Sequence, residues 1–321
     1  MNSFKPPFFM KNRHFQTIFP AFFTKVSDLN LEIERFELSD GDFVDCLWCD
    51  KPTKKMDKDI VILFHGLAGG VNSAYIKRVM KRLRDDGKSS VLMHFRGCSG
   101  IPNRLARSYH SGESGDAREF ISHLKTDYPL SNLFAIGYSL GGNMLLKLLG
   151  EYRDNSPIKK AIAVSVPMDL TICADEINRG FSKIYQKHLL KALNLDLAKK
   201  YKQHDMQKLI GKREEEIKDI SSFWEFDDTY TAPIHGFADA KNYYKKCSSK
   251  QFLKDIKTPT LIIHSKDDPF MSEKVIPNDD EISEFVELEI YEDGGHVGFV
   301  EGSIFNPKFW LEGRIGEYLT K

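Results

Sequence analysis

The sequence has no excess of charge of either sign, because 46 Lys and Arg residues balance 46 Asp and Glu residues among its 321. Proteins that bind nucleic acid or an anionic membrane through their overall charge carry a basic excess. We therefore expect no nucleic-acid partner. The sequence also lacks any apolar run near the length of about 18 residues that a transmembrane helix needs. This absence predicts that no segment spans a membrane, and it leaves peripheral membrane contact open.

Cysteine is scarce, and its five residues are scattered along the chain. An odd number of cysteines, without any Asn-x-Ser/Thr sequon, is typical of a reducing compartment rather than of a disulfide framework. The N-terminal segment contains prolines and a lysine where a secretory signal needs about 7 to 15 uninterrupted apolar residues. We therefore expect a cytoplasmic location. The five residues are Cys46, Cys49, Cys98, Cys173 and Cys247.

Motifs for cofactors are also missing. The sequence contains neither of the phosphate-binding patterns G-x-x-x-x-G-K-[ST] and G-x-G-x-x-G, nor the zinc motif H-E-x-x-H. Cys46 and Cys49 have C-x-x-C spacing, but they lie in a strand-like segment, where positions three apart face opposite sides. The histidines that could suggest a metal site form no close ligand pair in the sequence; they are His65, His94, His110 and His264. We expect neither a metal nor an organic cofactor.

Strand-like and helix-like segments alternate through the first half of the chain. Residues 31–38 and 43–49 flank the turn sequence Ser-Asp-Gly-Asp, which predicts a β-hairpin. Residues 59–64 form a short apolar run rich in β-branched side chains, as expected of a strand buried on both faces. The alternation predicts an α/β fold with a mostly parallel, doubly wound sheet and helices on both sides. Further helices are expected at 74–83, 117–124 and 144–149, and further strands at 90–95, 133–136 and 161–164.

The pattern changes in the second half of the chain. Residues 168–256 are polar, lysine-rich and mostly helical, and we interpret them as a helical cap inserted over the sheet. Strands are expected again at 260–263 and 286–291, and a last helix at 309–318. Residues 1–30 form an aromatic N-terminal arm that could dock on lipid or pack over the domain, and packing is the commoner arrangement. The prediction is therefore a single domain, residues 1–321, with an arm and a cap.

The segment Gly137-Tyr-Ser139-Leu-Gly141 matches the pattern G-x-S-x-G, which is weak evidence on its own. Its context makes it stronger, because it follows a predicted strand and opens a helical run, as a nucleophile elbow requires. In that sharp turn the serine backbone is strained and the two flanking glycine positions lie close together, so neither can carry a bulky side chain. The alternative is an ordinary tight turn between a strand and a helix. We take Ser139 as the candidate nucleophile.

A serine hydroxyl needs a base to remove its proton and an acid to hold that base in the correct tautomer. In folds with this elbow, the acid and then the histidine follow the serine along the chain. Asp267 and Asp268 follow one predicted strand, and His296 lies in a glycine-rich loop after the next. Groups at the carboxyl ends of parallel strands converge, so these side chains can meet Ser139. We favour Asp268 over Asp267 because it precedes Pro269, which biases its backbone toward an extended conformation.

A reaction of this kind also needs an oxyanion hole, which is a pair of N–H groups aimed at the developing negative charge. The segment His65-Gly-Leu67-Ala-Gly-Gly follows the buried strand at 59–64, where such a loop would lie. The candidate donors are the backbone amides of Leu67 and of Leu140, the residue after the candidate nucleophile.

Short segments along nearly the whole chain carry a resemblance to one family. They are residues 12–18, 65–69, 95–100, 137–143, 226–229, 232–237, 243–244, 267–270 and 294–299. In these segments the chain resembles the YheT-like family of α/β hydrolases, a branch with esterase and lipase members. The resemblance implies an α/β-hydrolase fold and a Ser-Asp-His triad at Ser139, Asp268 and His296. Many mammalian members begin with a membrane anchor, which this sequence lacks, so a membrane location does not carry over.

The resemblance also implies hydrolysis of carboxylic esters, with acylglycerols, phospholipids or short-chain esters as substrates in different members. The sequence thus predicts a serine esterase or lipase that acts on a small-molecule or lipid ester through an acyl-enzyme intermediate. Two alternatives stay open. One is a thioesterase or amidase with the same triad, and the other is a non-catalytic binding module with an α/β-hydrolase fold. An intact triad argues against the second.

Overall fold

The structure is a computed structural model that describes residues 4–23, 26 and 29–320. Residues 1–3, 24–25 and 27–28 of the predicted arm therefore lie outside the described residues. In the described part of the chain, eight strands form one sheet in the order β1-β2-β4-β3-β5-β6-β7-β8. They are β1 (Leu31–Glu37), β2 (Phe43–Cys49), β3 (Ile60–Phe64), β4 (Ser89–Met93), β5 (Leu133–Tyr138), β6 (Ile158–Val164), β7 (Thr260–Ser265) and β8 (Val286–Tyr291).

The direction of the strands confirms the predicted sheet. From β4 to β8 each neighbouring pair runs parallel, whereas β2 pairs antiparallel with both β1 and β4. The predicted hairpin is therefore the β1–β2 pair, and Gly41 supplies the positive φ of +83° in its turn. All residues of β3, β4 and β5 are buried, as expected of strands in the middle of a sheet covered on both faces.

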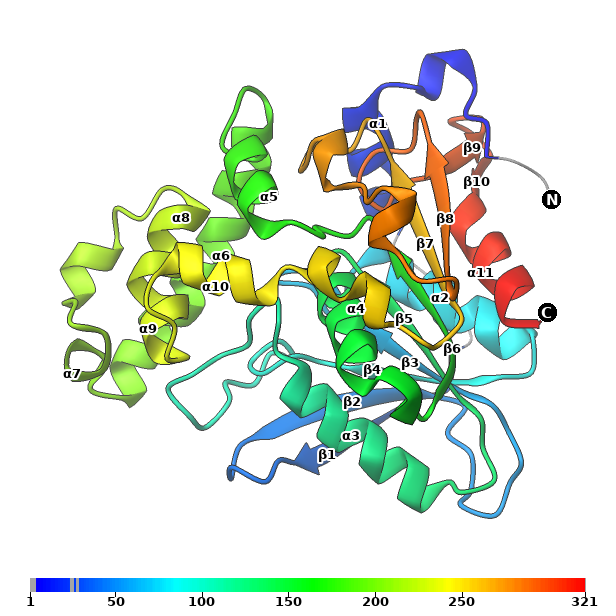
Figure 1. The fold of residues 1–321 in the computed structure, drawn as a ribbon, viewed down its shortest axis with the longest axis horizontal. Coiled ribbons are helices and arrows are strands. Elements are labelled where there is room, and N and C mark those ends of the chain that lie inside the picture. The colour runs from blue at the N-terminus through cyan, green and yellow to red at the C-terminus, as the bar shows by residue number, and fades with distance from the viewer. Residues whose placement is uncertain (1–3, 24–25, 27–28, 321) are drawn as a thin grey trace.

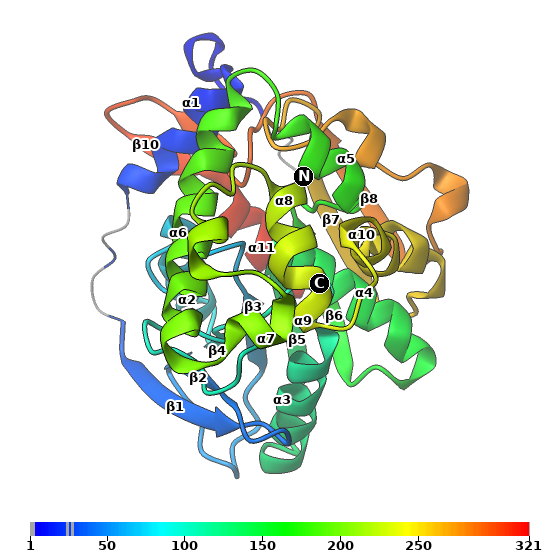
Figure 2. The same cartoon turned by 90° about the vertical axis from the view of Figure 1, so that its left-hand side faces the viewer.

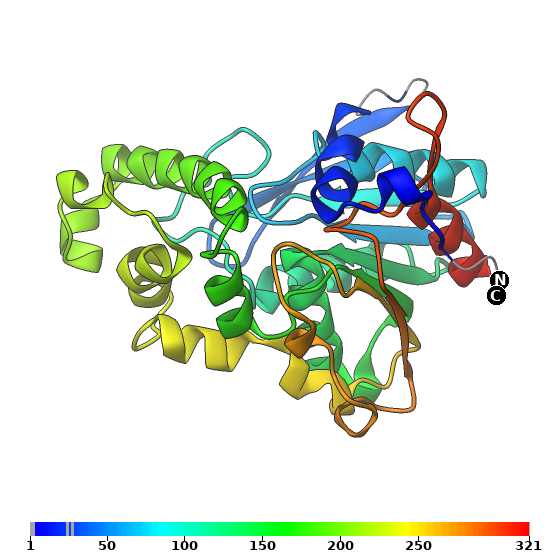
Figure 3. The same cartoon turned by 90° about the horizontal axis from the view of Figure 1, so that it is seen from above.

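Helices cover both faces of the sheet (Figures 1 and 3). On one face lie α2 (Ala74–Asp85) and α11 (Trp310–Thr320), and on the other lie α3 (Ser114–Asp127) and α4 (Leu140–Tyr152). Each face has its own apolar core, because alternate side chains of a strand point to opposite sides.

The two cysteines of β2 show this alternation directly. Cys46 belongs to the core on the α3 and α4 side, whereas Cys49 belongs to the core on the α2 and α11 side. Both thiols are free, and burial raises the pKa of each. The C-x-x-C spacing therefore places the two sulfurs on opposite faces of the sheet, as the sequence analysis expected.

The segment between β6 and β7 is helical and lies beyond one end of the sheet (Figures 1 and 3). Its helices are α5 (Leu170–Glu176), α6 (Ser182–Gln203), α7 (Met206–Ile210), α8 (Phe223–Phe226), α9 (Ala232–Ile234) and α10 (Ala240–Cys247). A single π-helical turn, Asp227–Thr231, joins α8 to α9. We call residues 168–256 the cap. It contains apolar clusters of its own, one of which joins α6 to Phe226 and Tyr230.

The described residues of the arm pack against the rest of the protein. Phe4, Met10 and Gln16 are buried, whereas Phe8 and Phe22 are 89% and 77% exposed. The arm contains the short helix α1 (Arg13–Ile18), which Figures 1 and 2 show above the end of the sheet, beside the last loops of the chain. Among the described residues, none of the helices combines the length and the apolar character that crossing a membrane would need.

A second, two-stranded sheet was not predicted. Its strands, β9 (Val300–Gly302) and β10 (Pro307–Phe309), pair antiparallel shortly after the loop that carries His296. Strands of three residues are too short to give a recognisable periodicity. This pair lies next to the arm, because the side chain of Gln16 hydrogen-bonds the backbone of Val300.

Candidate active site

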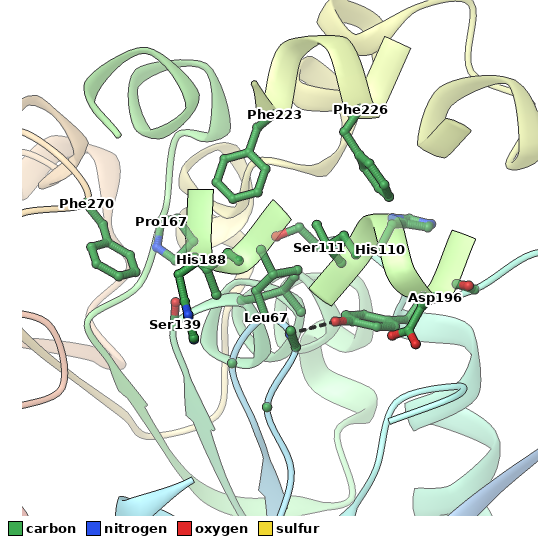
Figure 4. A pocket seen from close by; sticks show the side chains of 18 of the residues that line it. Leu67, His110, Ser111, Ser139, Pro167, His188, Asp196, Phe223, Phe226 and Phe270 are labelled. Carbon is green, nitrogen blue, oxygen red and sulfur yellow. Dashed lines mark hydrogen bonds between the residues drawn. The ribbon is translucent and has the colours of Figure 1, made fainter. Parts of the chain in front are cut away.

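Ser139 lies in the sharp turn between β5 and α4. Its backbone has a φ of +50°, a strained value for a residue other than glycine, and its N–H donates to Val164 O at 2.8 Å. A Cβ on Gly137 would lie 2.5 Å from Gly141 O, and a Cβ on Gly141 would lie 2.5 Å from His65 O. Both positions therefore require glycine, because backbone atoms approach too closely for any side chain. The turn leaves Ser139 half-buried on the wall of a cavity (Figure 4).

His296 and Asp268 lie side by side in the loops that follow β8 and β7. Nδ1 of His296 is 2.7 Å from Oδ2 of Asp268, and Asp268 is only 1% exposed. The other oxygen of this carboxylate accepts a hydrogen bond from Phe270 N at 2.8 Å. An ionised carboxylate can only accept hydrogen bonds, so the contact assigns the ring proton of His296 to Nδ1. The lone pair is then on Nε2.

Asp267 contacts a different group. Its Oδ1 accepts a hydrogen bond from Gly295 N at 2.9 Å. Burial raises the pKa of Asp267, and the hydrogen bond from Gly295 opposes this rise. Asp267 therefore holds the backbone of the loop before His296, whereas the carboxylate that reaches the imidazole belongs to Asp268.

Phe270 is a residue of this site that the sequence analysis missed. Its ring stacks on the imidazole of His296, with ring centroids 4.0 Å apart and 13° between the planes. The Phe270 ring also lies near the ring of Tyr185 in α6, at 5.0 Å between centroids. An aromatic residue two positions after Asp268 gives no sign in the sequence that it will cover a distant histidine. Its role depends on how the two loops meet.

The glycine-containing loop after β3 lies directly against the elbow. A Cβ on Gly66 would be only 3.3 Å from the Cβ of Ser139. Gly66 N donates to Tyr75 Oη at 3.0 Å, and Ala68 N donates to Tyr109 Oη at 2.8 Å. The backbone is therefore tied to a half-buried tyrosine on each side of Leu67.

The two predicted oxyanion donors lie in the same part of the molecule as Ser139. Leu67 and Leu140 both line the cavity that Ser139 lines, and Figure 4 shows Leu67 close to Ser139. The N–H of Leu140 belongs to the first residue of α4, a position whose amide has no partner within its own helix. The role of the two amides as oxyanion donors stays a prediction.

The cavity has a volume of about 510 Å³ and is bounded by the sheet ends, the arm and the cap. Phe223 and Phe226 of α8 lie across the cavity from Ser139 and Leu67 (Figure 4). This volume is within the range of about 300 to 1,000 Å³ that is usual for small-molecule sites. The cap supplies both apolar and polar lining residues, and the apolar ones suit a hydrocarbon chain. The apolar lining residues of the cap include Leu170, Ala174, Ile177, Leu189, Leu193, Leu197, Phe223 and Phe226.

Close to this cavity, the fold brings together three potential metal ligands that the sequence spacing did not indicate. The ligand atoms of His110, Glu113 and His235 lie within 4.8 Å of one another. Both ring nitrogens of His235, however, face backbone carbonyl oxygens, at 2.9 and 3.1 Å. Arg107 Nη1 donates to Glu113 Oε2 at 2.8 Å. No lone pair of His235 is directed at a shared point, and a guanidinium repels a cation, so these residues do not fit a metal ion.

Comparison with known proteins agrees with this geometry. Residues 59–303 match the family model of the alpha/beta hydrolase fold. The chain is 42% identical over 309 residues to the Escherichia coli protein named "Putative esterase YheT", and the match covers 96% of this chain and 90% of that protein. It is 29% identical over 260 residues to the monoacylglycerol lipase of Saccharomyces cerevisiae, covering 78% of this chain and 57% of that protein.

Solved structures support the fold independently. An esterase from Pyrococcus furiosus aligns with a TM-score of 0.55 at 17% identity, covering 91% of this chain and 92% of that chain. At this identity the likeness concerns the fold alone. The family model, in contrast, spans more than half of the sequence, and the Escherichia coli relative aligns over nearly all of it. The chain therefore belongs to the α/β-hydrolase family, in the YheT-like branch of esterase- and lipase-like proteins.

Proposed function

We propose that this protein is a serine hydrolase of carboxylic esters, with Ser139 as nucleophile, His296 as base and Asp268 as the acid that orients the base. The observation that carries the proposal is the 2.7 Å contact between His296 Nδ1 and Asp268 Oδ2, in a cavity that Ser139 also lines. A tight strand–helix turn does not by itself require a buried carboxylate beside a histidine. The contact therefore supports catalysis over the alternative of a purely structural turn.

In the first half-reaction, His296 Nε2 takes the proton from Ser139 Oγ while this oxygen bonds to the acyl carbonyl carbon. The carbonyl oxygen becomes an oxyanion and accepts hydrogen bonds from the amides of Leu67 and Leu140. The intermediate then collapses, and the C–O bond to the alcohol breaks. The departing alkoxide takes the proton from the imidazolium, which leaves an ester of Ser139.

In the second half-reaction, His296 removes a proton from water as the water oxygen attacks the acyl-enzyme. The carboxylic acid leaves, and Ser139 regains its proton from the imidazolium. Asp268 stabilises the imidazolium in both half-reactions. Because this carboxylate is only 1% exposed, solvent screens its attraction to the positive ring weakly.

We infer a substrate with an apolar acyl chain, of the acylglycerol or short-chain ester type. The apolar lining residues of the cap, including Phe223 and Phe226, support this inference, and so does similarity to a monoacylglycerol lipase. The proposed location is the cytoplasm, and the five free cysteines support a reducing compartment.

A fluorophosphonate probe followed by intact-mass measurement tests the proposal. We expect a single adduct on the wild type, mapped to Ser139 by peptide analysis, and no adduct on a folded Ser139→Ala variant. Thr126→Val, which changes an exposed position of α3, is the control and should be labelled like the wild type. A folded wild type that forms no adduct would contradict an activated Ser139 and favour a non-catalytic binding module.

Substrates that differ only in the bond to be cleaved separate the remaining alternative. Esters, thioesters and amides of one acyl chain can all be attacked by the same three groups, so the ratio of their kcat/KM values decides between esterase, thioesterase and amidase. We expect the oxygen ester to have the highest value. A preference for the thioester or the amide would replace the proposed substrate class.

A further inference from the structure

The N-terminal arm contacts the loop that carries His296 at the histidine itself. The N–H of His296 donates to Thr17 Oγ1 at 2.9 Å. The Thr17 hydroxyl in turn donates to Arg13 O, four residues earlier in α1, at 2.8 Å. The direction of the hydroxyl proton is thereby fixed, and the oxygen presents a lone pair to the loop.

Gln16, the preceding residue, holds the chain where this loop ends, at the first residue of β9. Its side chain is fully buried. Nε2 donates to Val300 O at 3.0 Å and to Met10 O at 2.9 Å, and Oε1 accepts a hydrogen bond from Val300 N at 2.7 Å. One amide side chain thus binds both backbone groups of Val300 and ties them to the start of the arm. A buried amide with this many partners has a single orientation.

The backbones of the arm and the loop also touch directly. A Cβ on Gly298 would lie 2.2 Å from Gln16 O, and a Cβ on Gly295 would lie 2.7 Å from Arg13 O. The loop needs such support because Val297 and Phe299 have positive φ values of +58° and +49°. Non-glycine residues keep this conformation only when their surroundings hold them in it.

We propose that Thr17, supported by Gln16, is a positioning residue for His296. Asp268 fixes one ring nitrogen and Phe270 covers one face of the ring, but the main chain of the histidine must also be held if Nε2 is to reach Ser139. The residues on either side are also held, because Gly295 N donates to Asp267 Oδ1 and Val297 N donates to Ser165 Oγ. Thr17 binds the amide between them. This inference rests on the proposed function, since it assigns His296 a reaction.

The test compares three substitutions by steady-state kinetics on one ester. Thr17→Val keeps the shape of the side chain and removes its hydroxyl. We expect kcat to fall about tenfold or more, because a small displacement of a catalytic group lowers the rate strongly. KM should stay within about twofold of the wild type. Thr17→Ser restores the hydroxyl and should return kcat to within about twofold of the wild type. Thr126→Val is the matched control, because Thr126 also donates to the carbonyl four residues earlier but lies away from the site. It should leave kcat unchanged.

Thr17 also lines the cavity, so a second measurement separates an effect on His296 from an effect on bound substrate. In a His296→Ala background, Thr17→Val should cause no further loss of the residual rate. A further tenfold loss there would overturn the proposal, and so would a wild-type kcat in Thr17→Val. If Thr17→Val does not fold, Thr17→Ala is compared with Thr17→Ser in the same way.

The fluorophosphonate probe distinguishes failure of this inference from failure of the proposed function. A folded wild type that forms no adduct refutes both. A wild type that is labelled at Ser139, together with a Thr17→Val variant labelled at the same rate, refutes only the positioning role. We expect the labelling rate of Thr17→Val to fall by the same factor as kcat, because phosphonylation of Ser139 also needs His296 as a base.

Discussion

The change from Asp268 to Asn is the sharpest test of the proposed acid. The Asn side chain has the shape of Asp, and its oxygen can still accept the hydrogen bond from Phe270 N. Its NH₂ group then faces Nδ1 of His296, where the carboxylate oxygen was at 2.7 Å. A donor at this place favours the tautomer with the proton on Nε2, and that nitrogen can no longer accept the proton of Ser139.

The expected loss follows from this tautomer change. Replacing the acid of a Ser-His-Asp triad by Asn lowers kcat by about 10⁴-fold. Since each factor of ten corresponds to about 1.4 kcal/mol, the activation free energy rises by about 5 kcal/mol. Asp268 contacts His296 but does not itself line the cavity, so KM should change by less than about threefold.

Hydrolysis of a p-nitrophenyl ester, followed by absorbance at saturating substrate, measures the loss. Asp267→Asn is the matched variant, because it makes the same chemical change one residue earlier and keeps an oxygen that can accept from Gly295 N. We expect it to lower kcat by no more than about tenfold, the scale of one weakened hydrogen bond. Near-wild-type turnover in Asp268→Asn, together with a 10⁴-fold loss in Asp267→Asn, would refute the assignment.

Two further predictions concern stability. Gly141→Ala should lower the free energy of unfolding by about 3 kcal/mol or more in urea titrations, because its Cβ would lie 2.5 Å from a backbone oxygen. Gly313→Ala in α11 is the control, since a Cβ there meets no atom within 4 Å. It should leave the free energy of unfolding unchanged or raise it by up to about 1 kcal/mol. Equal effects of the two substitutions would contradict the close-approach argument. Burial raises the pKa of Asp227 to about 6 from 3.8, so the stability that its protonation provides is complete below pH 3.8 and is lost as the pH rises through 6. As the pH rises from 4 to 7, the free energy of unfolding of Asp227→Asn should therefore increase relative to that of the wild type. If the two free energies change in parallel with pH, burial does not raise the pKa of Asp227.

Much of the fold could be predicted because its signals are local. The residues of β3 form a short apolar run that is typical of a strand covered on both faces, and the glycines around Ser139 mark a turn in which backbones touch. The order of Asp268 and His296 after the serine then follows from the fold. Other features have no local signal. The stacking of Phe270 on His296 and the pairing of β9 with β10 depend on contacts between loops that meet only in the folded chain.

The arm shows why such contacts are hard to predict from the sequence. It also contains a signal that could have indicated the contact between Thr17 and His296. Thr17 and His296 are separated by 279 positions, and the many phenylalanines around Thr17 indicate only packing or lipid contact. Yet Gln16 and Thr17 are polar residues within an aromatic segment, and burying them is unfavourable unless partners are present. Those partners are the backbone groups of His296 and Val300. Removing the arm would leave these amides unpaired beside a strained loop, so we expect the arm to be required for a correctly placed His296 even though it supplies none of the reacting groups.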